Sequence, residues 1–134
     1  MKDNRLINYI KDVLENMPAD WLRLTTHRLD IYNEKLAKTE FLDSFEALYQ
    51  ANNAAKAALS ELPTAYDYVR LGHPLSSVLE WAIAKDNHLP ATNVISFSSK
   101  AIPIMAVLRK NLLTEKNTQI LYTGELAYTF EDFY

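Results

Sequence analysis

The chain has 134 residues, of which 49% are hydrophobic, and it carries a net charge of −3 with no cysteine. This length fits one domain with a real core, and the missing cysteines exclude disulfides and thiolate metal sites. Charges of both signs are interspersed, so no block of like charge predicts a surface for nucleic acid or membrane. We therefore expect a cytoplasmic protein that binds neither, since its polar N-terminus is unlike a secretory signal.

Apolar residues at helical spacing predict that the segment 1–63 is helical. The first expected helix ends at Pro18, and Asp20 is placed to cap a second one that continues to Leu36. A third expected helix ends at Pro63 and carries a single apolar stripe. The stripe consists of Phe41, Phe45, Leu48, Asn52, Ala55, Leu59 and Leu62.

The second half, residues 64–134, has the pattern of helices mixed with strands. One helix is expected after Pro74, and another places Pro103 in its first turn, where a missing N–H costs nothing. The short apolar runs Asn93–Ser98 and Thr118–Thr123 are typical of buried strands. Because a strand, a helix and a strand in this order favour a right-handed crossover, we expect a parallel pair. The predicted fold is a single mixed α/β domain, mostly helical, with N-terminal helices packed on a small parallel β-α-β unit.

Two stretches of the second half resemble a known enzyme family. They are YDYVRLGHPLSSVLEWAIAK, residues 66–85, and FSSKAIPIMAVLRKNLL, residues 97–113. They resemble the N-terminal part of the large domain of cystathionine gamma-synthase, cystathionine beta-lyase and methionine gamma-lyase. These are the pyridoxal-phosphate (PLP) enzymes of cysteine and methionine metabolism, with the aspartate-aminotransferase-like fold. The resemblance covers residues 65–130, half of the chain.

The resemblance implies a cofactor-binding site. Its implied members are Tyr68, Arg70, Ser98, Ser99, Lys100 and Tyr128, with Tyr122 as second choice for the last. In the family, the Tyr and Arg of a Tyr-x-Arg motif reach the cofactor phosphate of the neighbouring subunit, as a phenol and a guanidinium can. The turn after the strand would hold the same phosphate through backbone N–H groups at a helix start. The last tyrosine would stack on the pyridine ring.

The sequence departs from the family pattern in two motifs and in length. Lys100 stands where the family's Ser-Ser-Gly turn has glycine, and His73 and Leu75 replace polar residues of a Gly-Asn-Pro-Thr motif. The family's Schiff-base lysine and the aspartate that pairs with the pyridine nitrogen have no counterpart before Tyr134. Covalent PLP chemistry needs both groups, so we expect no catalytic residue in this chain.

Three functional interpretations stay open at this point. The first is a truncated N-terminal portion of such a PLP enzyme, with at most phosphate or PLP binding. The second is a helical homo-oligomeric interaction module, suggested by the stripe from Phe41 to Leu62 and an incompletely covered sheet. The third is one subunit of a split PLP enzyme that a second polypeptide completes. No metal site is expected, because the three histidines share no ligand spacing. Trp21 and Trp81 are expected to anchor the core or an interface.

Overall fold

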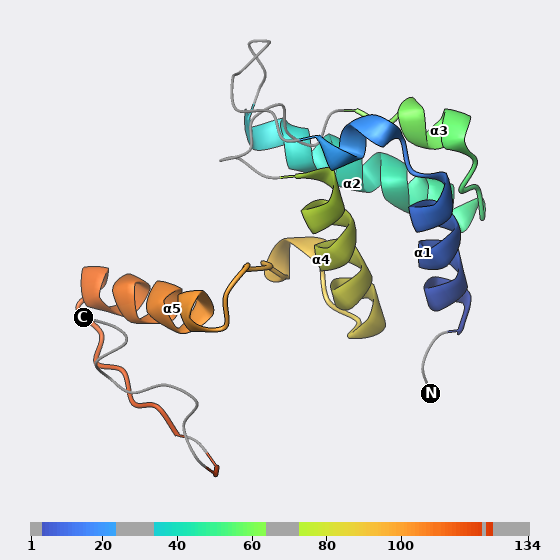
Figure 1. Cartoon of the computed structure of the whole chain (residues 1–134). Coiled ribbons are helices and arrows are strands. Elements are labelled where there is room, and N and C mark those ends of the chain that lie inside the picture. The colour runs from blue at the N-terminus through green and yellow to red at the C-terminus, as the bar shows by residue number, and fades with distance from the viewer. Residues whose placement is uncertain (1–3, 24–33, 64–72, 122, 125–134) are drawn as a thin grey trace. The chain divides into compact units, whose positions relative to one another are not determined.

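The computed structural model describes residues 4–23, 34–63, 73–121, 123 and 124, and contacts within the chain define two compact units. The units are residues 1–96 and 97–134, and each is described by itself. The first contains α1 (Asn4–Asn16), η1 (Ala19–Leu22), α2 (Glu34–Gln50), α3 (Lys56–Ser60), α4 (Pro74–Asp86) and η2 (Ala91–Asn93). The second contains α5 (Ala101–Leu113), and all are drawn in Figure 1.

Every regular element in the described ranges is helical, so the expected α/β fold with a parallel β-α-β unit is wrong. Neither Asn93–Ser98 nor the described part of Thr118–Thr123 forms a strand. The Ser96 N–H donates to the Glu80 carboxylate at 2.8 Å instead of to a strand partner. A short apolar run does not establish a strand by its own periodicity, and these two runs find no partner strand among the described residues.

The helices expected around the proline signals are confirmed. α1 ends two residues before Pro18, and α5 has Pro103 in its first turn. α4 begins with Pro74 at its first position, and His73 is its N-cap. The His73 Nδ1 accepts a hydrogen bond from the Leu75 N–H at 3.2 Å, which satisfies one of the free donors of the first turn.

Two expected helices differ from the prediction. Asp20 lies inside the short 3-10 turn η1, which ends where Arg23 takes an extended conformation, so no long helix begins there. The stripe expected on one long helix is divided between α2 and α3, because Asn52 has a positive φ of 50°. Asparagine tolerates this left-handed conformation, and the Asn53 N–H then bonds back to the Leu48 carbonyl at 2.9 Å.

The core of the first unit is built from aromatic side chains of α1, η1, α2 and α4. Phe45 is fully buried at its centre, stacked on Phe41 and in edge contact with Tyr9 and Trp81. Trp21 lies against Phe41, so both tryptophans are core anchors as expected. Aromatic pairs in these geometries add to the free energy gained from burying their area.

Candidate functional site

The site implied by the PLP-enzyme resemblance is only partly within the described residues. Tyr68, Arg70, Tyr128 and the second choice Tyr122 lie outside them. The turn formed by Ser98, Ser99 and Lys100 is described, and it directly precedes α5. Lys100 has an ordinary φ of −70°, so the turn does not require the glycine of the family pattern.

The serine of this turn has a structural role at the start of α5. The Ser99 hydroxyl accepts a hydrogen bond from the Ala101 N–H at 3.2 Å, while the three residues of the turn are exposed. The strand expected to lead into the turn is absent from the described residues 93–98. PLP binding therefore stays a prediction from sequence. An absorbance titration with PLP tests it, and a spectral change abolished by Arg70→Ala would support it.

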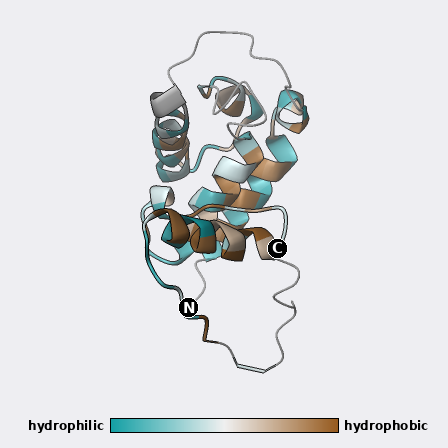
Figure 2. Cartoon of the chain, turned by 90° about the vertical axis from the view of Figure 1, so that its left-hand side faces the viewer, coloured by the Kyte–Doolittle hydropathy of each residue, from teal (hydrophilic) through white to brown (hydrophobic). Residues whose placement is uncertain are grey.

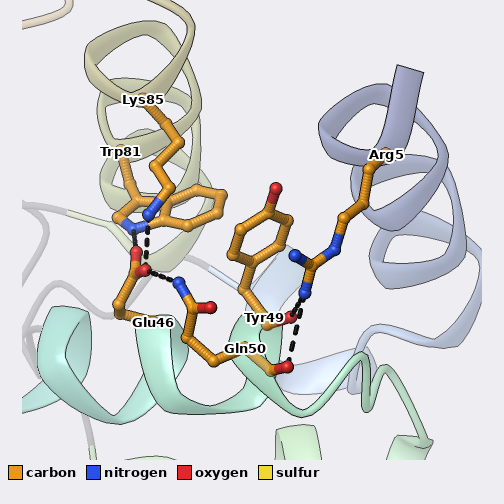
Figure 3. Close-up of polar contacts among 6 residues, drawn as sticks. All are labelled: Arg5, Glu46, Tyr49, Gln50, Trp81 and Lys85. Atoms are coloured by element: carbon orange, nitrogen blue, oxygen red, sulfur yellow. Dashed lines mark hydrogen bonds and ion pairs between the residues drawn. The ribbon is translucent and has the colours of Figure 1, made fainter. Parts of the chain in front are cut away.

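A polar network joins α2 to α4 in the first unit (Figure 3). Three donors surround the Glu46 carboxylate: Trp81 Nε1 at 2.9 Å, Lys85 Nζ at 2.5 Å and Gln50 Nε2 at 2.5 Å. Burial alone raises the pKa of Glu46, but these hydrogen bonds outweigh it and hold the pKa below its usual value. The carboxylate is thus ionised and already paired, which suits a structural link better than a general base.

Tyr49 lies between two cations that hold it in place from both sides. The Arg5 guanidinium carbon is 4.6 Å from the centre of the Tyr49 ring, and Lys85 Nζ is 5.1 Å from it. Arg5 also donates to the Tyr49 carbonyl at 2.9 Å, near the C-terminus of α2, where a positive charge is favourable. These contacts connect α1, α2 and α4 in one arrangement (Figure 3).

A buried carboxylate on α4 fixes the segment that follows η2. Glu80 forms an ion pair with Lys38 on α2. It also accepts hydrogen bonds from the N–H and the hydroxyl of Ser96, at 2.8 and 3.0 Å. Burial alone raises the pKa of Glu80, but these partners hold it below its usual value. Sequence patterns do not reveal such a contact, because the three residues are far apart in the chain.

The first unit contains a small notch beside the Glu46 network and a larger groove elsewhere. The notch has a volume of about 210 Å³ and is lined by residues of α2, α4 and the segment from Leu89 to Ala91. That volume is below the usual range for ligand pockets, and the Glu46–Lys85 pair occupies its polar side. The notch therefore gives no distinct chemistry for a substrate.

The groove between α1 and α4 is the stronger candidate. It has a volume of about 360 Å³ and is lined mainly by apolar side chains. Its lining residues are Leu6, Ile7, Ile10, Lys11, Ala82, Ile83 and Asp86. Since the N-terminal half of α1 lines it together with the C-terminal half of α4, the two helices are antiparallel, as Figure 1 shows.

Exposed apolar side chains extend this groove along both helices. On α1, Ile7 is 39% and Leu14 48% exposed; on α4, Leu79 is 51% and Ile83 42% exposed. The hydropathy colours show hydrophobic and hydrophilic residues side by side on the same helices (Figure 2). We call these four residues, with the groove residues Ile10 and Ala82, the α1/α4 face.

The α1/α4 face was not identified from sequence, although one signal could have revealed it. Apolar residues at Leu6, Ile7, Tyr9, Ile10, Val13 and Leu14 form a band on α1 that is wider than one core-facing stripe. The stripe expected to drive homo-oligomerisation has a different role. Phe41, Phe45 and Leu59 are buried in the core of the first unit, so those members cannot form an exposed interface.

Neither a search for metal sites and membrane spans nor comparison with known proteins assigns a function to this chain. In the described parts of the chain, no group of three His, Cys, Asp or Glu side chains could hold a metal ion, and no helix is long and apolar enough to cross a membrane. No protein-family model, curated protein or solved structure matches the chain. The PLP-enzyme resemblance therefore stays an expectation based on residues 65–130.

Proposed function

We propose that this protein is a helical interaction module that binds a second copy of itself through the α1/α4 face. The observation that carries the proposal is an apolar groove between two antiparallel helices, flanked by exposed leucine and isoleucine side chains. Burying such a surface removes hydrocarbon from water, which is the main favourable term in most protein association.

The size of the face is compatible with a weak dimer. Each of Ile7, Leu14, Leu79 and Ile83 is about half exposed, so complete burial would contribute about 0.7–1.5 kcal/mol for each side chain. Association costs about 4–15 kcal/mol, which the four side chains of each of two copies can offset. We expect a dissociation constant between about a micromolar and a millimolar.

A pair of matched variants tests which apolar surface mediates self-association. Ile83→Glu places a carboxylate in the α1/α4 face, whereas Leu112→Glu makes the same kind of change on α5, at a side chain that is 77% exposed. In sedimentation velocity, we expect Ile83→Glu to abolish the dimer and Leu112→Glu to leave it intact. Far-UV circular dichroism checks that both variants keep their helix content.

Two results of this experiment would contradict the proposal. One is a wild-type chain that sediments as a monomer at every concentration. The other is the reverse pattern, in which Leu112→Glu abolishes the dimer and Ile83→Glu does not, because that would assign the interface to α5.

A further inference from the structure

One cation and one anion line the same short α1/α4 groove. Lys11 on α1 and Asp86 on α4 both contribute to it, together with Ile7 and Ile83. Neither forms an ion pair with another described residue, whereas Lys38 and Lys85 are paired with glutamates. The face thus combines an apolar centre with two unpaired charges of opposite sign, one on each helix.

The two charges lie close enough in height along the helices to meet across a dimer. The groove covers residues 6–11 of α1, which corresponds to about 8 Å along the helix axis. Measured along the helix axes, the positions of Lys11 and Asp86 therefore differ by no more than about 8 Å. The long, flexible lysine side chain can span most of this separation.

We infer that the second copy binds through a two-fold axis that runs along α1 and α4, an arrangement that rests on the proposed function. This axis places each α1 opposite α4 of the second copy and keeps each residue at its own level along the axis. Lys11 of each copy then faces Asp86 of the other, so the interface contains two reciprocal ion pairs. Two layers of two helices pack on each other.

The other face-to-face arrangement fits these charges poorly. With the two-fold axis across the helices, each α1 would lie opposite the α1 of the second copy. Lys11 would then meet Lys11 or an apolar neighbour such as Ile7, and the two copies of Asp86 would be placed in the same way. Like charges brought together, or a charge desolvated without a partner, disfavour that arrangement.

A charge-swap experiment tests the reciprocal pairing. Lys11→Glu alone places two carboxylates opposite each other twice in its homodimer, and Asp86→Lys alone places two ammonium groups opposite each other twice. A one-to-one mixture can form a heterodimer in which both positions carry opposite charges. In it, the introduced carboxylate of one chain faces the introduced ammonium group of the other, and the native Lys11 faces the native Asp86.

We expect each variant alone to dimerise about tenfold more weakly than the wild type, and the mixture to recover wild-type affinity. Sedimentation velocity measures all three samples, and higher salt should reduce the differences. Unchanged affinity in both variants, or a mixture no tighter than either alone, would overturn this arrangement. If the wild type still dimerises and Ile83→Glu still abolishes the dimer, only the arrangement fails; a monomeric wild type overturns the proposed function as well.

Discussion

The two units of this chain contain similar apolar helices but bury them differently. α4 in the first unit buries Val78, Trp81 and Ala84 against other helices. α5 in the second unit is at least as rich in apolar residues, yet each of its side chains is only partly buried or exposed. Because two helices of similar apolar content differ in burial, composition alone does not establish a core. Most helical stability comes from packing an apolar face against other elements, as α4 packs against α2.

The largest expected difference between the units comes from removing a core aromatic. Phe45→Ala should lower the free energy of unfolding by about 3–5 kcal/mol, because the side chain is fully buried among three aromatic rings. Leu113→Ala in α5 should change it by less than about 0.5 kcal/mol, since that side chain is exposed. Urea unfolding followed by tryptophan fluorescence measures this, because Trp21 and Trp81 both lie in the first unit.

Equal effects of these two substitutions would contradict the difference in burial between Phe45 and Leu113. If Phe45→Ala prevents folding altogether, Phe45→Leu is the milder variant, and it should still destabilise more than Leu113→Ala.

The sequence predicted helices better than the contacts that hold them together. Proline signals and apolar spacing located α1, α4 and α5, because those helices depend on local chemistry. The break at Asn52 and the missing strand at Asn93–Ser98 were not predicted. The first depends on one residue in a left-handed conformation, and the second on the capture of a backbone N–H by a distant carboxylate.

The candidate site was predictable only in part, for a related reason. The wide apolar band on α1 is visible in the sequence, but its neighbour α4 is about 70 residues away along the chain, so the groove between them requires the fold. The residues implied by the PLP-enzyme resemblance, Tyr68, Arg70 and Tyr128, lie outside the described residues.

Glu80 fixes Ser96 at the end of the first unit, and loss of its charge should have the next largest effect. Glu80→Gln should lower the free energy of unfolding by about 1–3 kcal/mol near neutral pH, because it removes the ion pair with Lys38. The pKa of Glu80 is lower in the folded state than its usual value of 4.5. Its stabilisation is therefore complete above pH 4.5 and is lost as the pH falls through the lower, folded-state value.

The measurement for Glu80 is urea unfolding of both proteins at neutral pH and at several acidic pH values. The difference between wild type and Glu80→Gln should shrink on acidification. Glu15→Gln is the control, since Glu15 is exposed and should change stability little at any pH. A wild-type and variant difference that grows toward acidic pH would contradict the assigned role.

The smallest expected effects come from the two helix starts. His73→Ala should destabilise the first unit by about 1 kcal/mol, because it removes the side-chain acceptor at the start of α4, and His73→Asn should restore most of it. Ser99→Ala removes the corresponding acceptor before α5 and should leave the urea midpoint of the first unit unchanged. A larger shift for Ser99→Ala than for His73→Ala would show that the second unit stabilises the first.

Light scattering of the wild-type protein across a wide concentration range tests directly whether the chain binds a second copy of itself, as the α1/α4 face predicts. The weight-average mass should rise with concentration from the 15.4 kDa of one chain toward twice that value. A mass that stays at 15.4 kDa up to millimolar concentration would contradict it.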